Sequence, residues 1–282
     1  MKLVVDVGHT ETVMGVVNDA RETVASWRVS TQVPRTADEY VHLLRSMLRE
    51  RDFGPEVLRM AVLGSVVPSA TEVLHPTLGR VVSGQVIVVD PTSALPIRLE
   101  VDEPQTVGAD RIVNTLAARE LYGRDTIVVD LGTATTYDLV TADGAFVGGV
   151  IAPGVSAGLE WLSRRTAKLP SVGMTRPAAV IGTRTEACIR SGIFYGVIDA
   201  VDGMVERIRE EWDRTDVLVV ATGGDADVVG PVASTVDEVA PFLTLTGLAI
   251  AGEILGGGGQ RASRAAYQPI QRFDRPRSRH QR

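Results

Sequence analysis

The sequence predicts a mixed α/β fold made of two similar halves. Two stretches share one pattern: an apolar run ending in aspartate, a short turn with glycine and threonine, and a second apolar run. They are Leu3–Val17 and Thr126–Val140. β-branched residues dominate both arms of each stretch, which favours two strands joined by a turn. Because nearly half of the 282-residue chain separates the copies, we expect two similar domains that face one cleft.

The turns of the two stretches carry the groups expected of a phosphate-binding site. Alignment pairs Asp6 with Asp130, Gly8 with Gly132, and Thr12 with Thr136. A carboxylate at the strand end, beside N–H and O–H donors, is suited to holding a phosphate and its cation. One D-x-G sequence would be an ordinary turn, but two copies in the same apolar frame favour function.

Apolar spacing predicts the other elements. Strands are expected at 23–30, 60–67, 86–89, 145–151 and 216–220. Helices are expected at 38–50, 69–78, 108–119, 185–212 and 244–255. Residues 96–104 are expected to form a loop or irregular extended segment. From Gly256 the chain has four glycines and then arginine without periodicity, so 256–282 is expected to be a disordered tail.

Composition narrows the class of protein. The chain has 44% hydrophobic and 23% charged residues, as soluble globular proteins do. Its net charge is −6, although the tail alone holds seven arginines and one aspartate. The acidic body argues against a nucleic-acid partner. The lone Cys188 excludes intrachain disulfides and a cysteine zinc site. No membrane-spanning run or export signal is apparent, so a cytoplasmic location and no membrane partner are expected.

Two further segments could contribute to a site. Gly108-Ala109-Asp110-Arg111 opens a predicted helix. Asp110 could simply cap that helix, or serve as base for a substrate hydroxyl, with Arg111 binding a carboxylate. Residues 221–225 form a glycine-rich turn after a strand, which could accommodate the adenosine end of a nucleotide. With only two lysines in the chain, phosphate charge must be offset by arginine, metal ions or backbone donors.

Three common site patterns are rejected. Residues 154–158 match the G-x-S-x-G nucleophile elbow, but the only later histidine is His280, in the predicted tail. The chain has no G-x-x-x-x-G-K-[ST] sequence, and no G-x-G-x-x-G follows its first strand. P-loop and Rossmann sites therefore have no motif support.

Several of these segments, in their order along the chain, resemble the type III pantothenate kinases of the actin-like ATPase/sugar kinase superfamily. The most specific are VGADR at 107–111 and DLGTATTYD at 130–138. Supporting segments are DVGHT at 6–10, SVVP at 65–68, GGVIAPG ending at Gly154, IGTRTEACIRSG at 181–192, ATGGD at 221–225 and LTLTGL at 243–248.

The resemblance implies ATP-dependent phosphorylation of pantothenate to 4′-phosphopantothenate, the first step of coenzyme A synthesis. It implies Mg²⁺ with ATP, a monovalent cation (K⁺ or NH₄⁺) and a homodimer. It also implies two duplicated actin-like (ribonuclease H-like) domains with a cleft between them. We expect these domains at 1–118 and 119–255.

The resemblance also implies residue roles. Asp110 is the expected proton acceptor, Asp130 the expected ligand of the monovalent cation, and Thr185 an expected contact of pantothenate. The other expected pantothenate contacts are Gly108, Ala109, Asp110 and Arg111. The expected ATP contacts are Asp6, Val7, Gly8, His9, Thr10, Glu11, Thr12 and Thr133.

Two positions depart from the usual family pattern. His9 stands where the family usually has asparagine, and Val101 stands where it often has tyrosine. These departures leave two alternatives open: a non-catalytic or weakly active nucleotide-binding regulatory paralogue, or a kinase for another small hydroxylated acid.

Overall fold

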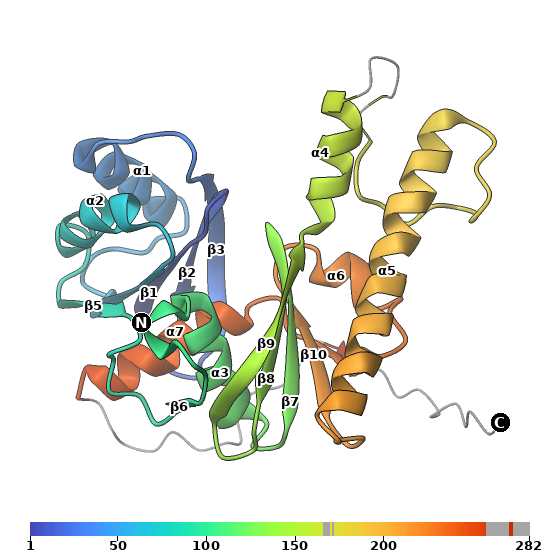
Figure 1. The fold of residues 1–282 in the computed structure, drawn as a ribbon. Coiled ribbons are helices and arrows are strands. Elements are labelled where there is room, and N and C mark those ends of the chain that lie inside the picture. Colours follow the sequence, from blue (N-terminus) through green and yellow to red (C-terminus); the bar gives the residue numbers. More distant parts are fainter. Residues whose placement is uncertain (166–169, 171, 258–270, 273–282) are drawn as a thin grey trace. The chain divides into compact units, whose positions relative to one another are not determined.

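The computed structural model describes residues 1–165, 170, 172–257 and 271–272. The chain forms two compact units (Figure 1). The first contains Met1–Thr126, Asp138–Val150 and the helix α7 (Leu243–Leu255), and the second contains Ile127–Tyr137 and Ile151–Pro241. Helix α7 thus belongs to the first unit, although the sequence placed it in the range expected for the second domain.

The first unit is built on a five-stranded sheet with the order β3-β2-β1-β4-β5. Strands β1, β2 and β3 form an antiparallel meander, whereas β4 and β5 continue the sheet in parallel with β1. The bounds are β1 Lys2–Val7, β2 Glu11–Val17, β3 Thr23–Ser30, β4 Met60–Ser65 and β5 Gln85–Val89. All five strands were predicted from the sequence, each within about two residues at its ends.

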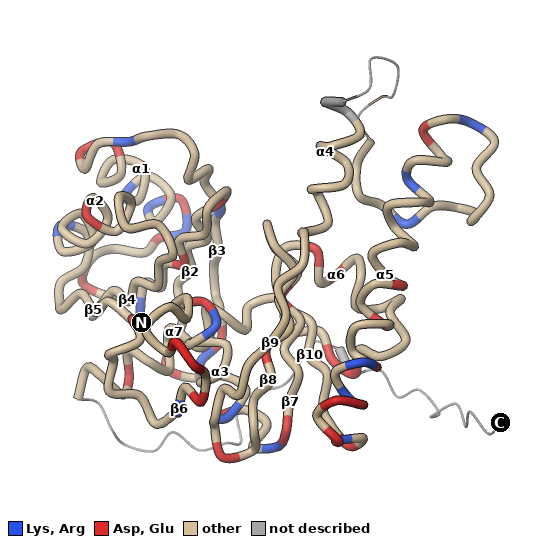
Figure 2. Tube along the Cα trace, viewed as in Figure 1, with Lys and Arg blue, Asp and Glu red and all other residues tan. Residues whose placement is uncertain are grey.

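Helices cover both faces of this sheet. The alternate residues Leu3, Val5 and Val7 pack in one core with α1 (Ala37–Arg49) and α2 (Pro68–Gly79). Val4 and Val62 point the other way, into a core shared with α3 (Ala109–Leu121) and α7. Because successive side chains of a strand face opposite sides, a strand buried on both sides is mostly apolar, as β4 and the centre of β1 are. The charged residues of β1 are Lys2 and Asp6, at and near its two ends, and β4 has none; Figure 2 colours the charged residues along the Cα trace.

The first helix is specified by its own ends. Thr36 accepts a hydrogen bond from the N–H of Glu39, and the Glu39 carboxylate accepts one from the N–H of Thr36. This reciprocal capping satisfies two otherwise unpaired donors, and it lowers the pKa of Glu39. Helix α2 begins with Pro68, which suits the first helical turn, and it continues through Pro76.

The second sheet has the order β12-β11-β10-β7-β8-β9-β6. Its strands are β6 Arg98–Leu99, β7 Thr126–Leu131, β8 Ala134–Val140, β9 Ala145–Pro153, β10 Leu218–Thr222, β11 Glu238–Val239 and β12 Gln271–Arg272. The two-residue β6 pairs in parallel with β9 inside the first unit, within the segment expected to be a loop or irregular extended chain. A short 3₁₀ helix, Pro104–Thr106, precedes α3.

The second unit carries the helices α4 (Val155–Arg165), α5 (Thr185–Glu211) and α6 (Ala226–Val229). The long α5 buries Phe194, Ile198, Val201 and Val205 along one stripe, and its bounds match the prediction to within a residue. Helices α4 and α6 were not predicted. Most of the predicted disordered tail, 256–282, lies outside the described residues. Within the tail the structure describes residues 256–257 and Gln271–Arg272, and the latter form β12.

Candidate active site

In the first unit, the ends of β1 and β4 lie beside the start of α3. Asp6 is opposite Gly64 in the β1–β4 register, and the N–H of Val66 donates to the carbonyl of Val7 at 3.1 Å. A Cβ on Gly64 would lie 3.5 Å from the Cβ of Ala109. The fold therefore brings together two segments predicted independently, the Asp6 strand end and the Asp110 helix start.

The turn between β1 and β2 is closed by a hydrogen bond from the N–H of Gly8 to the carbonyl of Glu11, at 3.0 Å. His9 and Glu11 are exposed on it, whereas Thr12 is buried. The Oγ1 atoms of Thr12 and Thr31 lie 2.8 Å apart, and the N–H of Thr31 donates to the carbonyl of Thr10. Thr12 thus anchors the turn to β3, while residues 8–11 form its outer part.

Asp110 lies in the first turn of α3, as its second residue, two positions after the N-cap Gly108. Its Oδ1 accepts the N–H of Arg111 at 2.8 Å. A Cβ on Gly108 would stand only 2.4 Å from that oxygen and 3.1 Å from the Val66 side chain. Glycine at 108 therefore leaves room for the Asp110 carboxylate at the positive end of the helix dipole.

Arg111 is held from two sides by residues of the first unit. Its Nε donates to Oδ1 of the fully buried Asp138 at 2.7 Å, and its guanidinium carbon lies 4.8 Å from the centre of the Phe146 ring. Asp138 lies within the DLGTATTYD segment, yet neither it nor Phe146 was assigned a role from the sequence. The available signal was a carboxylate in the middle of a strand of mostly apolar and threonine residues.

In the second unit, the β7–β8 turn is one residue shorter than its counterpart. The N–H of Gly132 donates to the carbonyl of Ala134, at 3.2 Å, where Gly8 reaches to Glu11. The glycines and aspartates of the two hairpins still correspond. By hydrogen bonding and burial, however, the counterpart of Thr12 is the buried Thr135, not the half-buried Thr136 aligned from the sequence.

Two glycines allow other segments of the second unit to approach this hairpin. A Cβ on Gly154 would lie 2.2 Å from the carbonyl oxygen of Thr133, and a Cβ on Gly223 would lie 2.4 Å from Oδ1 of Asp130. Gly223 also has a positive φ of 92°, which favours glycine. The N–H of Asp225 donates to the carbonyl of Leu131 at 3.1 Å. The glycine-rich turn 221–225 therefore packs directly on the Asp130 hairpin.

The expected site residues divide between the units. Asp6–Thr12 and Gly108–Arg111 lie in the first, whereas Asp130, Thr133 and Thr185 lie in the second. Thr133 is exposed at the tip of its turn. Thr185 is also exposed, at the first position of α5 after the N-cap Arg184.

The described residues include carboxylates at turns but form no preformed metal cage. No group of three or more His, Cys, Asp or Glu side chains placed to hold a metal occurs in the described part of the chain. Mg²⁺ in kinases is held by one or two carboxylates together with substrate phosphates, so single carboxylates at glycine-rich turns fit that mode of binding. None of the described helices has the length and apolar character needed to span a membrane.

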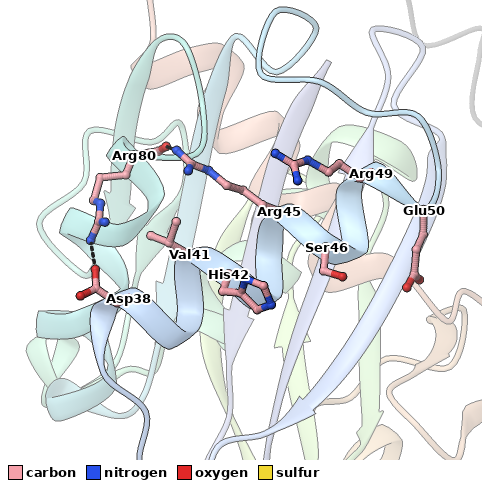
Figure 3. Close-up of a pocket in the computed structure, with 8 residues that line it drawn as sticks. All are labelled: Asp38, Val41, His42, Arg45, Ser46, Arg49, Glu50 and Arg80. Carbon is pink, nitrogen blue, oxygen red and sulfur yellow. Dashed lines mark hydrogen bonds and ion pairs between the residues drawn. The ribbon is translucent and has the colours of Figure 1, made fainter.

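Two hollows lie along the exposed side of α1, apart from all of these residues. One, of about 560 Å³, is lined by eight residues, seven from α1 and its C-terminal end and the eighth Arg80 (Figure 3). Arg80 pairs with Asp38 across it, at 2.8 Å. The other, of about 910 Å³, adjoins it along β3 and the following loop. Neither contains a residue expected to bind ATP or pantothenate.

Comparison with known proteins shows the family. A model of the type III pantothenate kinases matches residues 2–207. The type III pantothenate kinase of Moorella thermoacetica is 42% identical over 252 residues, covering 89% of this chain and 98% of its own. That of Frankia casuarinae is 43% identical over 249 residues, covering 88% and 97%.

Solved structures support the fold. A ROK family glucokinase from Streptomyces griseus, solved with glucose and AMPPNP, superposes with a TM-score of 0.53 at 13% identity, covering 91% of this chain and 99% of its own. The ethanolamine utilization protein EutJ of Carboxydothermus hydrogenoformans gives 0.53 at 18% identity, covering 89% of each chain. The predicted actin-like ATPase/sugar kinase fold is therefore confirmed, and by its sequence the chain belongs to the type III pantothenate kinase family.

Proposed function

We propose that this protein transfers the γ-phosphoryl group of ATP to the hydroxyl of pantothenate, giving 4′-phosphopantothenate and ADP, the first step of coenzyme A biosynthesis. The observation that carries the proposal is the placement of Asp110 in a chain of this family. Its carboxylate lies at the start of α3, beside the strand end that bears Asp6. We place the reaction in the cytoplasm because its phosphoryl donor is ATP.

Asp110 acts as the proton acceptor. The substrate oxygen forms a bond to the γ-phosphorus while the bond from phosphorus to the bridging oxygen of ADP breaks, and the hydroxyl proton passes to the carboxylate. Phosphoryl transfer requires the protein mainly to position groups and neutralise charge. A well-placed base contributes about 10²–10⁴-fold. The hydrogen bond from the N–H of Arg111 fixes one carboxylate oxygen and leaves the other for the hydroxyl.

ATP phosphates are bound by the two glycine turns. Residues 6–12 supply backbone donors and the Asp6 carboxylate in the first unit, and Thr133 supplies a hydroxyl in the second. Mg²⁺ accompanies the nucleotide and neutralises the phosphate charge that two lysines cannot offset. Asp130 is the proposed ligand of a monovalent cation, K⁺ or NH₄⁺, and a Cβ at position 223 would lie only 2.4 Å from its Oδ1 atom.

Pantothenate is bound by Gly108, Ala109, Asp110, Arg111 and Thr185. Arg111 is suited to the carboxylate of this substrate because a guanidinium offers several N–H donors in a fixed plane. The Arg111 side chain is partly exposed at the start of α3, so a bound substrate could reach its guanidinium.

The protein is further proposed to be a homodimer. Large apolar side chains are exposed in the second unit: Ile151, Trp161, Val180 and Ile181, of which Ile181 is 85% exposed. Contiguous exposed apolar patches mark interaction surfaces, and a second copy of the chain is the proposed partner for these residues.

The test is release of ADP from ATP and Mg²⁺, measured with and without pantothenate, in buffers containing K⁺ or Na⁺. Pantothenate-dependent ADP release that is faster in K⁺ is expected. ADP binding without any turnover would instead favour the regulatory paralogue. Turnover with another small hydroxy acid but not pantothenate would favour a kinase of different specificity.

A further inference from the structure

We infer that Asp138 and Phe146 are positioning residues that set the acid specificity of the kinase, by holding the Arg111 guanidinium in one orientation toward the substrate carboxylate. This inference rests on the proposed phosphorylation of pantothenate. It concerns two residues in β8 and β9 that lie outside the expected substrate-binding set.

The first step of the argument is the ion pair. The Asp138 side chain is completely buried and the Arg111 side chain is 16% exposed. Their Nε–Oδ1 distance of 2.7 Å is that of a strong, charge-assisted hydrogen bond. Replacing such a buried pair by apolar residues is often neutral or stabilising. A contribution to stability therefore does not by itself explain why β8 has a buried carboxylate.

The second step is the ring. Phe146 is 2% exposed, and its ring lies against the guanidinium, with 4.8 Å from the guanidinium carbon to the ring centre. An arginine over an aromatic ring is attracted by the negative face of the ring. Asp138 fixes the Nε edge of the guanidinium and Phe146 restricts its plane, so little freedom remains for the group to rotate.

The third step is what these contacts leave available. Of the five N–H donors of the guanidinium, Asp138 takes the one on Nε. The Nη2 atom is buried and has no hydrogen-bond acceptor among the described residues. The side chain is 16% exposed, so the N–H donors that Asp138 does not take are suited to an acceptor from outside the chain. Because Arg111 follows Asp110, one substrate could place its carboxylate at Arg111 and its hydroxyl, at the other end of the molecule, at Asp110.

The experiment compares two substrates: pantothenate, and its alcohol analogue in which a hydroxymethyl group replaces the carboxylate. The ratio of their kcat/KM values does not depend on how much of each preparation is folded. Asp138→Asn keeps the shape of the side chain but removes its charge, and Phe146→Leu keeps apolar bulk but removes the ring. In each variant the ratio is expected to fall by roughly tenfold, the scale of one charged hydrogen bond. The change should appear in KM for pantothenate, with KM for ATP unchanged.

A double variant separates positioning from a merely structural role. In an Arg111→Ala background, Asp138→Asn should cause no further change in the acid-to-alcohol ratio, because the group that it positions is gone. Asp143→Asn, which alters an exposed carboxylate just beyond β8, is the matched control and should leave the ratio unchanged.

An unchanged ratio in both Asp138→Asn and Phe146→Leu would overturn the inference, as would equal losses with the two substrates. A wild-type protein that phosphorylates neither substrate would overturn the proposed function instead, so the two failures are distinguishable.

Discussion

Asp110 and Tyr137 are both ionisable side chains, but their surroundings suit them to different tasks. Asp110 is half-buried at a helix start with one oxygen bonded to a backbone N–H, which suits it to meet a substrate. Tyr137 is 2% exposed in β8, and burial, with a smaller effect of Asp202, raises its pKa to about 12. The first residue is expected to affect turnover and the second to affect stability.

Asp110→Asn is expected to lower kcat by about 10²–10⁴-fold while ATP binding persists, because an amide cannot accept the hydroxyl proton. Turnover and nucleotide binding by calorimetry are the measurements. Asp52→Asn, an exposed aspartate with φ of 58° that asparagine tolerates, is the control. Turnover near the wild-type rate in Asp110→Asn would remove Asp110 from the mechanism.

Tyr137 predicts a loss of stability at high pH. Its pKa is raised on folding, so between pH 10 and 12 the unfolded chain releases a proton that the folded chain keeps. Unfolding therefore becomes easier as the pH rises through this window, by about 1–2 kcal/mol. Urea unfolding at pH 8.5 and 11.5 should show a smaller pH effect in Tyr137→Phe than in the wild type. Tyr195→Phe, which alters a half-buried tyrosine in α5, is the control. Equal pH effects in all three proteins would show that Tyr137 is not the cause of the lost stability.

At the scale of elements, α7 is almost wholly buried and was predicted as an ordinary amphipathic helix. Its buried residues surround most of its circumference, and Glu253 near its end accepts ion pairs from Lys2 at 2.9 Å and Arg21 at 2.8 Å. The apolar spacing located the helix correctly. What it could not show is that α7 packs against α3 and the first sheet, because those contacts join residues more than 100 positions apart.

Gly247 lets α7 approach α3. A Cβ at this position would lie 2.1 Å from the carbonyl oxygen of Val113. Gly247→Ala should therefore lower the free energy of unfolding by about 1–3 kcal/mol, the cost of overpacking a core. Gly196→Ala in α5, where a Cβ would meet nothing within 4 Å, should raise it by about 0.5–1 kcal/mol, since alanine favours a helix. Denaturant unfolding measures both, and changes of the same sign would be contrary to this expectation.

For the whole molecule, the exposed apolar residues of the second unit predict assembly. Trp161 in α4 is 61% exposed, and placing a charge in an apolar interface is unfavourable because the charge must lose its hydration. Trp161→Glu is expected to convert the proposed dimer to monomer in sedimentation velocity runs. Val33→Glu, at a 50% exposed position of the first unit, should leave the dimer intact. A wild type that sediments as a monomer would refute the prediction.

The sequence by itself determined the elements whose pattern is local: both hairpins, the strands of the first sheet, the longest helices, and the segments that show the family. It also identified Asp6 and Asp110 as candidate residues of one site, because a few flanking residues suffice to indicate a turn at Asp6 and a helix start at Asp110. Short elements such as β11 and α6 were missed, because two to four residues carry no measurable period.

Only the tertiary structure decided which distant residues meet. Three such contacts or correspondences depend on packing between segments or on turn length. They are the contacts of Asp138 and Phe146 with Arg111, the approach of Gly223 to Asp130, and the correspondence of Thr12 with Thr135. Periodicity records which face of an element is apolar, but it does not record which other element covers that face. For that reason the sequence alone predicted the segments that carry the proposed reactive residues, whereas the side chains that hold those residues in place were found only in the structure.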